Sequence, residues 1–420
     1  MKDFPVKYLI LVLFTLSFAL FTAIPAKAEK QITEISGKVK NSRNKKVIPN
    51  VSISIPGSNI STVTNDEGFF ILKIPSSLIK NGIKAEQIGF QSKFMLMDEG
   101  VAGKEELTIL LEPTGKVLKE VLVLGGDPRG IVEEALKKIP DNYSDKNNLF
   151  SGFYRETIQK GSRFINISEA MVDVLKKPYK HRDTYGEKVS LNRGRTILSP
   201  KPSDTLAVKI MGGPYMPIML DAVKNGEHLF NLDEIDYFEF SMAPAAMIDD
   251  RVHYVINFKP AVSFSYPLNS GTFYIDGENL TISRVEFQLD MKDKDKVTRS
   301  ILQKKPIGLN FKPIEVSGVV TYKNIDGKAY INYISSKMRF KCDWKKRLFS
   351  STYTTFAEMV MVDRDDNPDK NTKLNESFGR RKIFSDLVDK YWDEDFWKDY
   401  NIIEPTESLE KAVDKLKKHQ

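Results

Sequence analysis

Long runs of strand-forming residues dominate the second half of this sequence. Between residues 233 and 365, β-branched and aromatic residues alternate with polar ones, as in RVHYVINFKP and KAYINYISSKMRFKCDW. Turn-forming sequences separate neighbouring runs at 276–279 (DGEN) and 324–327 (NIDG). Long strands joined by tight turns predict an antiparallel meander. One face of such a sheet would pack on helices or enclose a cavity.

The first 28 residues are predicted to be a cleavable secretory signal peptide. Two lysines give a positive start, residues 8–24 are apolar and uncharged, and an Ala-Lys-Ala sequence ends at Ala28, just before Glu29. This pattern is typical of a signal peptide that is cleaved between Ala28 and Glu29. A permanent anchor helix is the alternative, although the apolar run is short for a bilayer span. We therefore expect an exported protein, located in the periplasm or at the periplasmic face of the outer membrane.

The chain beyond the signal peptide has the length of two or three domains, and no second apolar stretch predicts a transmembrane segment. Its charge is mildly basic, because the net charge of +7 falls to +5 without the three Lys and one Asp of the signal peptide. That charge is spread along the chain, so we do not expect nucleic acid as a partner. The single cysteine, Cys342, excludes an internal disulfide and is expected in or near a β-core.

Residues 29–124 alternate short strand-like runs with Gly, Pro, Asn and Asp. Every second residue of 51–55 and of 70–74 can face one core. The sequence NDEG at 65–68, between two of these runs, predicts a hairpin turn. The region is therefore predicted to be a small antiparallel β-sandwich.

Four segments of this region resemble the carboxypeptidase regulatory-like domain, which has a transthyretin-like β-sandwich fold. They are ISGKV at 35–39, IPNVSI at 48–53, TVTNDEGFF at 62–70 and IGFQ at 88–91. The resemblance implies an exported protein of the Bacteroidetes type, in which such domains often precede outer-membrane receptors. It implies a packing or recognition role and no peptidase activity. The residues that follow are too few for a receptor's plug and transmembrane barrel, so we do not expect a receptor.

The rest of the chain divides into three predicted parts. Residues 125–148 form a linker and a helix capped by Asp127, residues 149–365 form an antiparallel β-rich domain, and residues 366–420 form a helical tail. The strand pattern of the β-rich domain is similar to the curved sheet of periplasmic lipoprotein-carrier proteins, whose half-barrel holds acyl chains. The predicted fold class is mainly β (α+β overall), with a transthyretin-like sandwich followed by a curved antiparallel sheet or half-barrel and packing helices.

The GFYRE sequence at 152–156 contains two charged neighbours, Arg155 and Glu156. In a strand these two side chains point to opposite faces, which argues against a paired catalytic role. We interpret Arg155 as a structural residue inside the half-barrel or at a charged edge.

Residues 199–226 are rich in Pro, Gly and Met. Core packing is the preferred interpretation of this segment, and a lid over an apolar cavity is the alternative. Thr205 lies in an Asp-Thr-Leu sequence, similar to the O-glycosylation site of periplasmic Bacteroidetes proteins. The candidate lid residues are Met211, Tyr215, Met216 and Met219.

Sequence motifs for catalysis are scarce. No zinc-peptidase motif, nucleophile elbow, phosphate loop or dinucleotide fingerprint is present. The Asp-rich segment 363–369 lacks the Gly and Glu that an EF-hand needs. We therefore predict no catalytic residue, no cofactor and no metal. The four histidines are His181, His228, His253 and His419.

The predicted function is that of a non-catalytic cell-envelope protein. Its sandwich is attached to a β-rich domain that binds a lipid, an outer-membrane partner or a glycan. The alternative is an envelope hydrolase whose site assembles from scattered carboxylates and His. The motifs of the sequence do not by themselves predict such an enzyme. A deep apolar cavity against the sheet would favour a carrier, whereas a polar cleft that gathers His228 or His253 with carboxylates would favour a hydrolase.

Overall fold

The computed structural model describes residues 32–97, 106–114, 126–201, 212–226, 231–345, 350–366 and 400–417, with short stretches and single positions between them. The predicted signal peptide lies outside the described residues, together with Ala28, Glu29, Thr205, Met211 and His228. No helix in the described ranges is long and apolar enough to cross a membrane.

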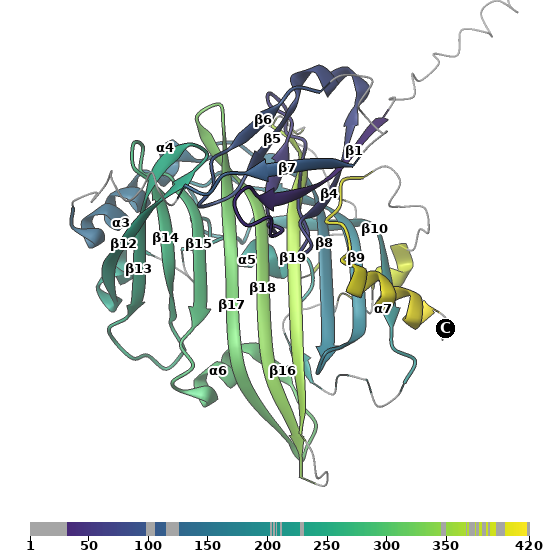
Figure 1. Cartoon of the computed structure of the whole chain (residues 1–420). Helices are drawn as coiled ribbons and strands as arrows, with labels where there is room; N and C mark the ends of the chain where they lie inside the picture. The colour runs from purple at the N-terminus through teal and green to yellow at the C-terminus, as the bar shows by residue number, and fades with distance from the viewer. Residues whose placement is uncertain are drawn as a thin grey trace, which may run out of the picture.

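The N-terminal region forms two small sheets around one apolar core (Figure 1). Side chains that alternate along the strands, such as Phe70, Leu72 and Ile74, are buried between the sheets. This burial pattern confirms the predicted sandwich. The first sheet has the order β4 (Phe69–Pro75), β1 (Ile32–Asn41), β7 (Leu107–Leu111), and the second has the order β3 (Ser61–Val63), β2 (Ser52–Ser54), β5 (Ile83–Glu86), β6 (Lys93–Met95); the 3-10 helix η1 (Ser76–Asn81) follows β4.

Two details of the sandwich differ from the prediction. Strand β1 pairs antiparallel with β4 but parallel with β7. The chain passes through the second sheet before it adds β7, and such a crossover permits parallel pairing. The turn at 65–68 forms, with Gly68 N donating to Asn65 O at 2.9 Å and Gly68 at φ 71°. It joins β3 to β4, which lie in different sheets, so it is a corner between sheets and not a hairpin.

The described part of the second domain is built on a 10-stranded antiparallel sheet that stays open (Figure 1). The predicted turns at 276–279 and 324–327 join consecutive antiparallel strands, which confirms the meander. The first three strands of the domain continue the same sheet, because β8 pairs with β19. The strand order is β10 (Lys188–Leu198), β9 (Arg163–Lys176), β8 (Asn148–Lys160), β19 (Ser351–Asp365), β18 (Lys328–Trp344), β17 (Leu309–Ile325), β15 (Ile282–Leu289), β14 (Asn269–Asp276), β13 (Arg251–Pro260), β12 (Phe238–Ile248).

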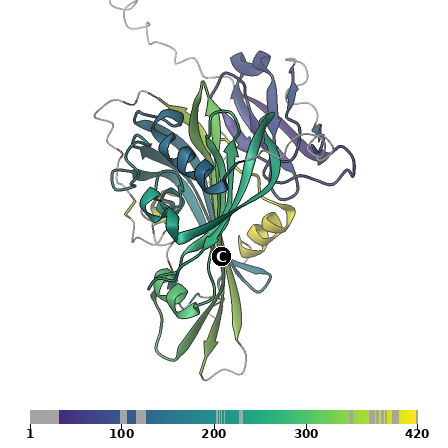
Figure 2. The same cartoon turned by 90° about the vertical axis from the view of Figure 1, so that its left-hand side faces the viewer.

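Most helices and short segments cover one face of this sheet, and the sandwich and the C-terminal helix cover the other (Figure 2). Asp127 caps α3 as predicted, since its carboxylate accepts hydrogen bonds from Arg129 N and Gly130 N. Cys342 is buried in β18, as expected. The remaining elements are α3 (Pro128–Lys137), α4 (Ile139–Asn142), α5 (Tyr215–Met219), η3 (Leu232–Tyr237), α6 (Lys294–Ile301), η4 (Val388–Tyr391), α7 (Glu407–Lys417) and the strand pair β11 (Lys209–Ile210) and β16 (Leu302–Lys304).

The C-terminal segment lies between the sandwich and the large sheet. Asn401 Nδ2 donates to Lys73 O at 3.0 Å, and Lys73 N donates to Asn401 Oδ1 at 2.6 Å. Thr62 Oγ1 donates to Ile402 O at 3.0 Å. Ile402 and Ile403 join an apolar cluster with residues of β3, β8, β9, β18 and β19. This segment therefore fastens the sandwich to the sheet.

Arg155 lies at the centre of the same contact region. Its guanidinium pairs with Glu169 at 2.7 Å and Glu358 at 3.3 Å, and it donates to Ile403 O at 2.7 Å. Glu156 points to the opposite face, where it accepts a hydrogen bond from Gly213 N at 2.9 Å. The two neighbours of the GFYRE sequence thus serve different faces of β8, as predicted.

Candidate functional site

A cleft between the sandwich and the large sheet encloses a cavity of about 210 Å³. Its walls come from β2, β3, β5 and the adjoining loops on the sandwich side, and from β12 to β15, β17, β18 and the adjoining turns on the sheet side. These segments are far apart in the sequence. The cleft therefore exists only when the two domains are docked.

A tight turn brings acidic side chains of the large sheet to the sandwich. Asp249 and Asp250 join β12 to β13 and both have positive φ, which Asp tolerates in two-residue hairpin turns. Ser92 N donates to Asp250 Oδ1 at 3.1 Å, and Gly89 N donates to Met247 O at 3.2 Å. These bonds hold Asp249 in the wall of the cleft.

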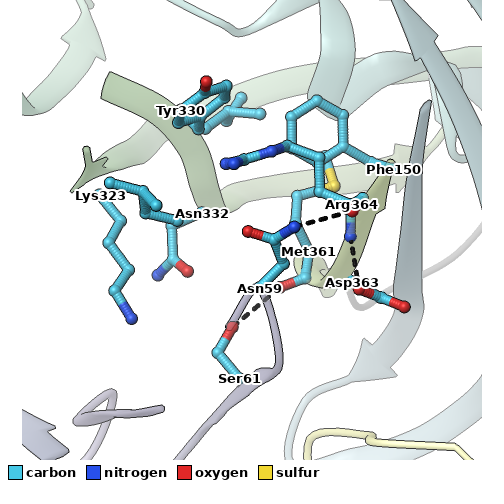
Figure 3. Close-up of a pocket in the computed structure, with 11 residues that line it drawn as sticks. Asn59, Ser61, Phe150, Lys323, Tyr330, Asn332, Met361, Asp363 and Arg364 are labelled. Atoms are coloured by element: carbon cyan, nitrogen blue, oxygen red, sulfur yellow. Dashed lines mark hydrogen bonds between the residues drawn. The ribbon is translucent and has the colours of Figure 1, made fainter. Parts of the chain in front are cut away.

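Figure 3 shows a smaller pocket of about 20 Å³ that shares Lys323 and Asn332 with the cleft. In its wall, Asn59 Nδ2 donates to Arg364 O at 2.8 Å, which ties the sandwich to β19. The Arg364 guanidinium lies 3.4 Å from the centre of the Tyr330 ring. The Lys323 side chain points away from the Arg364 guanidinium and from the Tyr330 ring.

Two carboxyl groups meet in the cleft from the two domains. Burial and a hydrogen bond to Asp249 raise the pKa of Glu86 to about 7. Burial alone would raise the pKa of Asp249 also, but hydrogen bonds from Glu86 and Lys84 outweigh burial and lower it. The Lys84 ammonium contacts both carboxyl groups. The pair therefore shares one proton, which stays mainly on Glu86 below neutral pH.

This arrangement predicts a pH dependence of stability. The pKa of Glu86 is higher in the folded than in the unfolded chain, so its contribution is complete below about pH 4.5 and is lost as the pH rises to about 7. The loss can reach about 1.4 kcal/mol per pH unit. Urea unfolding at a series of pH values should show that E86Q lacks this part of the wild-type loss.

The exposed Glu112 provides a control for this comparison, because E112Q should follow the wild-type pH profile. Other buried acids are unchanged in both variants, so their contributions cancel between wild type and E86Q. Identical pH profiles for wild type and E86Q would contradict a shared proton at the domain interface.

His253 and Ser283 form a hydrogen-bonded pair in the cleft. The His253 side chain on β13 is 1% exposed, and its Nε2 lies 2.8 Å from Ser283 Oγ. Its Nδ1 lies 3.0 Å from the carbonyl oxygen of Arg251. Burial lowers the pKa of His253, so the ring is neutral at neutral pH.

Several polar groups of the cleft wall lack partners within the described residues. The buried oxygens Ser52 Oγ and Thr281 Oγ1 have no hydrogen-bond partner there. Burial lowers the pKa of the Lys323 ammonium, although the negative charges of Glu86 and Asp249 act to raise it. Buried hydroxyls without partners are costly in a folded protein, so these two oxygens are candidates for pairing with a polar ligand or water.

The residues singled out from the sequence have different positions. Tyr215, Met216 and Met219 lie in α5, on the face of the sheet away from the sandwich (Figure 2). Tyr215 is buried in the main core and donates to Thr184 O at 2.9 Å, whereas Met216 and Met219 are partly exposed. None of these three lines the cleft.

Among the residues that the sequence analysis weighed as possible site residues, His253 lines the cleft. It lies there with Glu86, Asp249 and Asp276, which matches the arrangement that favours a hydrolase. Ser283 was missed, because a lone serine in a strand gives no sequence signal. Among the described residues, no group of three or more His, Cys, Asp or Glu side chains is placed to hold a metal ion.

Comparison with known proteins identifies the N-terminal region. Residues 35–123 match the CarboxypepD_reg-like domain family, which confirms the resemblance seen in the sequence. No curated protein matches the chain.

Two solved structures show a partial likeness. A DUF1329 family protein from Desulfovibrio piger ATCC 29098 is 11% identical, with 59% of this chain and 96% of that chain covered and a TM-score of 0.26. A LolA superfamily protein from Nitrosomonas europaea is 14% identical, with 60% of this chain and 99% of that chain covered and a TM-score of 0.22. At these TM-scores neither likeness supports an inference about this chain.

Proposed function

We propose that this chain is a cell-envelope binding protein whose sandwich and large sheet together hold a glycan in the cleft between them. The observation that carries the proposal is the pair of buried hydroxyls, Ser52 and Thr281, which face the cleft without partners among the described residues. Sugar hydroxyl groups both donate and accept hydrogen bonds, so a sugar can pair with these two side-chain hydroxyls. The carboxylates and Lys323 provide further acceptors and donors.

The other two predicted ligand classes fit the geometry less well. An acyl chain needs an apolar cavity, but the face of the sheet opposite the sandwich packs against α3, α5 and η4 in one continuous core. A stable protein partner usually contacts about 800 Å² of surface on each side, and a concave cavity of about 210 Å³ is not a surface of that extent. At about 210 Å³ the cavity is smaller than a typical ligand pocket of about 300–1,000 Å³, so it would hold about one sugar unit, with the rest of the glycan outside it.

Calorimetric titration of the full-length chain tests the proposal. The probes are peptidoglycan fragments and lipopolysaccharide core oligosaccharides, with phosphatidylethanolamine vesicles for comparison. We expect binding of at least one oligosaccharide, and we expect K323M to weaken it about 10-fold, equivalent to ~1.4 kcal/mol. The substitution removes a charged donor from the cleft wall.

Lys312 provides the matched control, because it is exposed and lies on the same strand outside the cleft. K312M should bind as the wild type does. Binding of vesicles but of no oligosaccharide would replace the glycan proposal with a lipid carrier. Undiminished oligosaccharide binding by K323M would show that the oligosaccharide binds outside the cleft.

A further inference from the structure

We infer that the cleft is also an ester-hydrolase site, with Ser283 as the nucleophile and His253 as its general base. The inference rests on the proposed function in one respect, that the same cleft holds the glycan. Its substrate class is a small acyl ester carried by that hydroxyl-rich ligand.

The tautomer of His253 follows from its two partners. A carbonyl oxygen only accepts hydrogen bonds, so the 3.0 Å contact with Arg251 O places the proton on Nδ1. In the neutral ring Nε2 is then an acceptor, and the Ser283 hydroxyl donates to it across 2.8 Å. This is the direction of hydrogen bonding that activates a serine nucleophile.

An irregularity in the sheet sets Ser283 apart from its neighbours. Tyr274 of β14 pairs with Arg284, and Ile275 pairs with Ile282, so Ser283 is the extra residue of a β-bulge. Bulges re-aim side chains and are frequent beside active sites. Both Ser283 and His253 line the cavity, and Ser283 is half-buried whereas His253 is almost fully buried. The nucleophile is thus accessible and the base is protected from water.

The reaction proceeds in two balanced steps. Ser283 Oγ bonds to the ester carbonyl carbon while its proton passes to His253 Nε2. The bond between that carbon and the alcohol oxygen then breaks, and the alcohol leaves with the proton from His253. Water attacks the acyl-serine with the same proton transfers, which releases the carboxylic acid and restores both residues.

The surroundings of His253 favour esters over amides. Its orienting partner is a neutral carbonyl, and Asp276 is occupied by Arg251, with two contacts of 2.7 and 2.9 Å. The protonated ring is therefore stabilised less than in a triad with a carboxylate. Alcohols leave more readily than amines, so an ester is the substrate that this pair can cleave. The Thr281 hydroxyl provides a hydrogen-bond donor in the same cavity.

Labelling and kinetics with the full-length chain test the inference. A fluorophosphonate probe should modify Ser283, as mapped by peptide mass spectrometry, and p-nitrophenyl acetate should leave an acetyl group there. We expect S283A and H253Q to lower kcat/KM by about 100-fold or more. Activity should fall at acidic pH as His253 becomes protonated, below the usual range for histidine because burial lowers its pKa.

Ser317, which lies on β17 outside the cleft, provides the control S317A, and this variant should keep wild-type activity. Labelling of the wild type decides the question even if S283A does not fold. Oligosaccharide binding without labelling or hydrolysis would overturn the esterase site and leave the proposed function standing. Hydrolysis without oligosaccharide binding would support the role of Ser283 and His253 and contradict the proposal that the cleft holds a glycan. If neither hydrolysis nor oligosaccharide binding is observed, both the esterase site and the proposed function are overturned.

Discussion

Replacing Asp221 by alanine should lower the free energy of unfolding by about 3–5 kcal/mol. The Asp221 carboxylate is fully buried and accepts hydrogen bonds from Tyr179 at 2.9 Å and Tyr322 at 2.6 Å. It also pairs with Lys176 at 2.8 Å. Burial alone would raise the pKa of Asp221, but Lys176 and the hydrogen bonds lower it. Without this carboxylate, the buried Lys176 ammonium keeps only Glu187, at 3.1 Å, as an ion-pair partner within the described residues.

Urea unfolding followed by circular dichroism measures this effect. The matched control is E239A, which breaks the exposed pair of Glu239 with Lys259 and should cost less than about 1 kcal/mol. A loss within ~1 kcal/mol of the control would show that the buried cluster rearranges or admits water when Asp221 is removed.

The second large effect is expected for Arg155. R155M should also cost about 3–5 kcal/mol, because it leaves the buried Glu358 without its ion-pair partner. It also removes the 2.7 Å hydrogen bond to Ile403 O, which helps to hold the C-terminal segment against the sheet. Hydrogen exchange should therefore accelerate in residues 400–406 as well as in β8.

R339M is the control for this measurement, because Arg339 is only partly buried and lies on the same sheet. It should leave both the stability and the exchange of residues 400–406 nearly unchanged. If R155M destabilised the sheet but left the exchange of that segment unchanged, Arg155 would not be what fastens it.

Local patterns were sufficient to predict the meander of the large sheet and the start of its first helix. The turns at 276–279 and 324–327 could be read from Gly, Asn and Asp between alternating runs, and they join the strands as expected. The helix start at Asp127 followed from a capping side chain and a proline in the first turn. Each of these features depends on neighbours within a few residues, so the local sequence is enough to predict it.

The cleft could not be predicted in this way. Glu86 and Asp249 belong to different domains, and their shared proton depends on how those domains dock. Ser283 lies at a bulge in the cavity wall, and neither strand sequence marks that irregularity. The buried charges Lys176 and Asp221 read as ordinary surface residues, because their burial is compensated by partners distant in the sequence.

The central place of β19 in the sheet imposes an order on folding. The sandwich is built from nearby segments, so it can form while the chain is still being synthesised. The large sheet cannot, because β8 pairs with a strand that is made only after residue 350. Until then β8–β10 and β12–β18 are two half-sheets with unpaired edges, which expose them to wrong pairing and aggregation. Joining them requires closure of a long loop, which predicts slow folding and a need for protection of the unfinished chain.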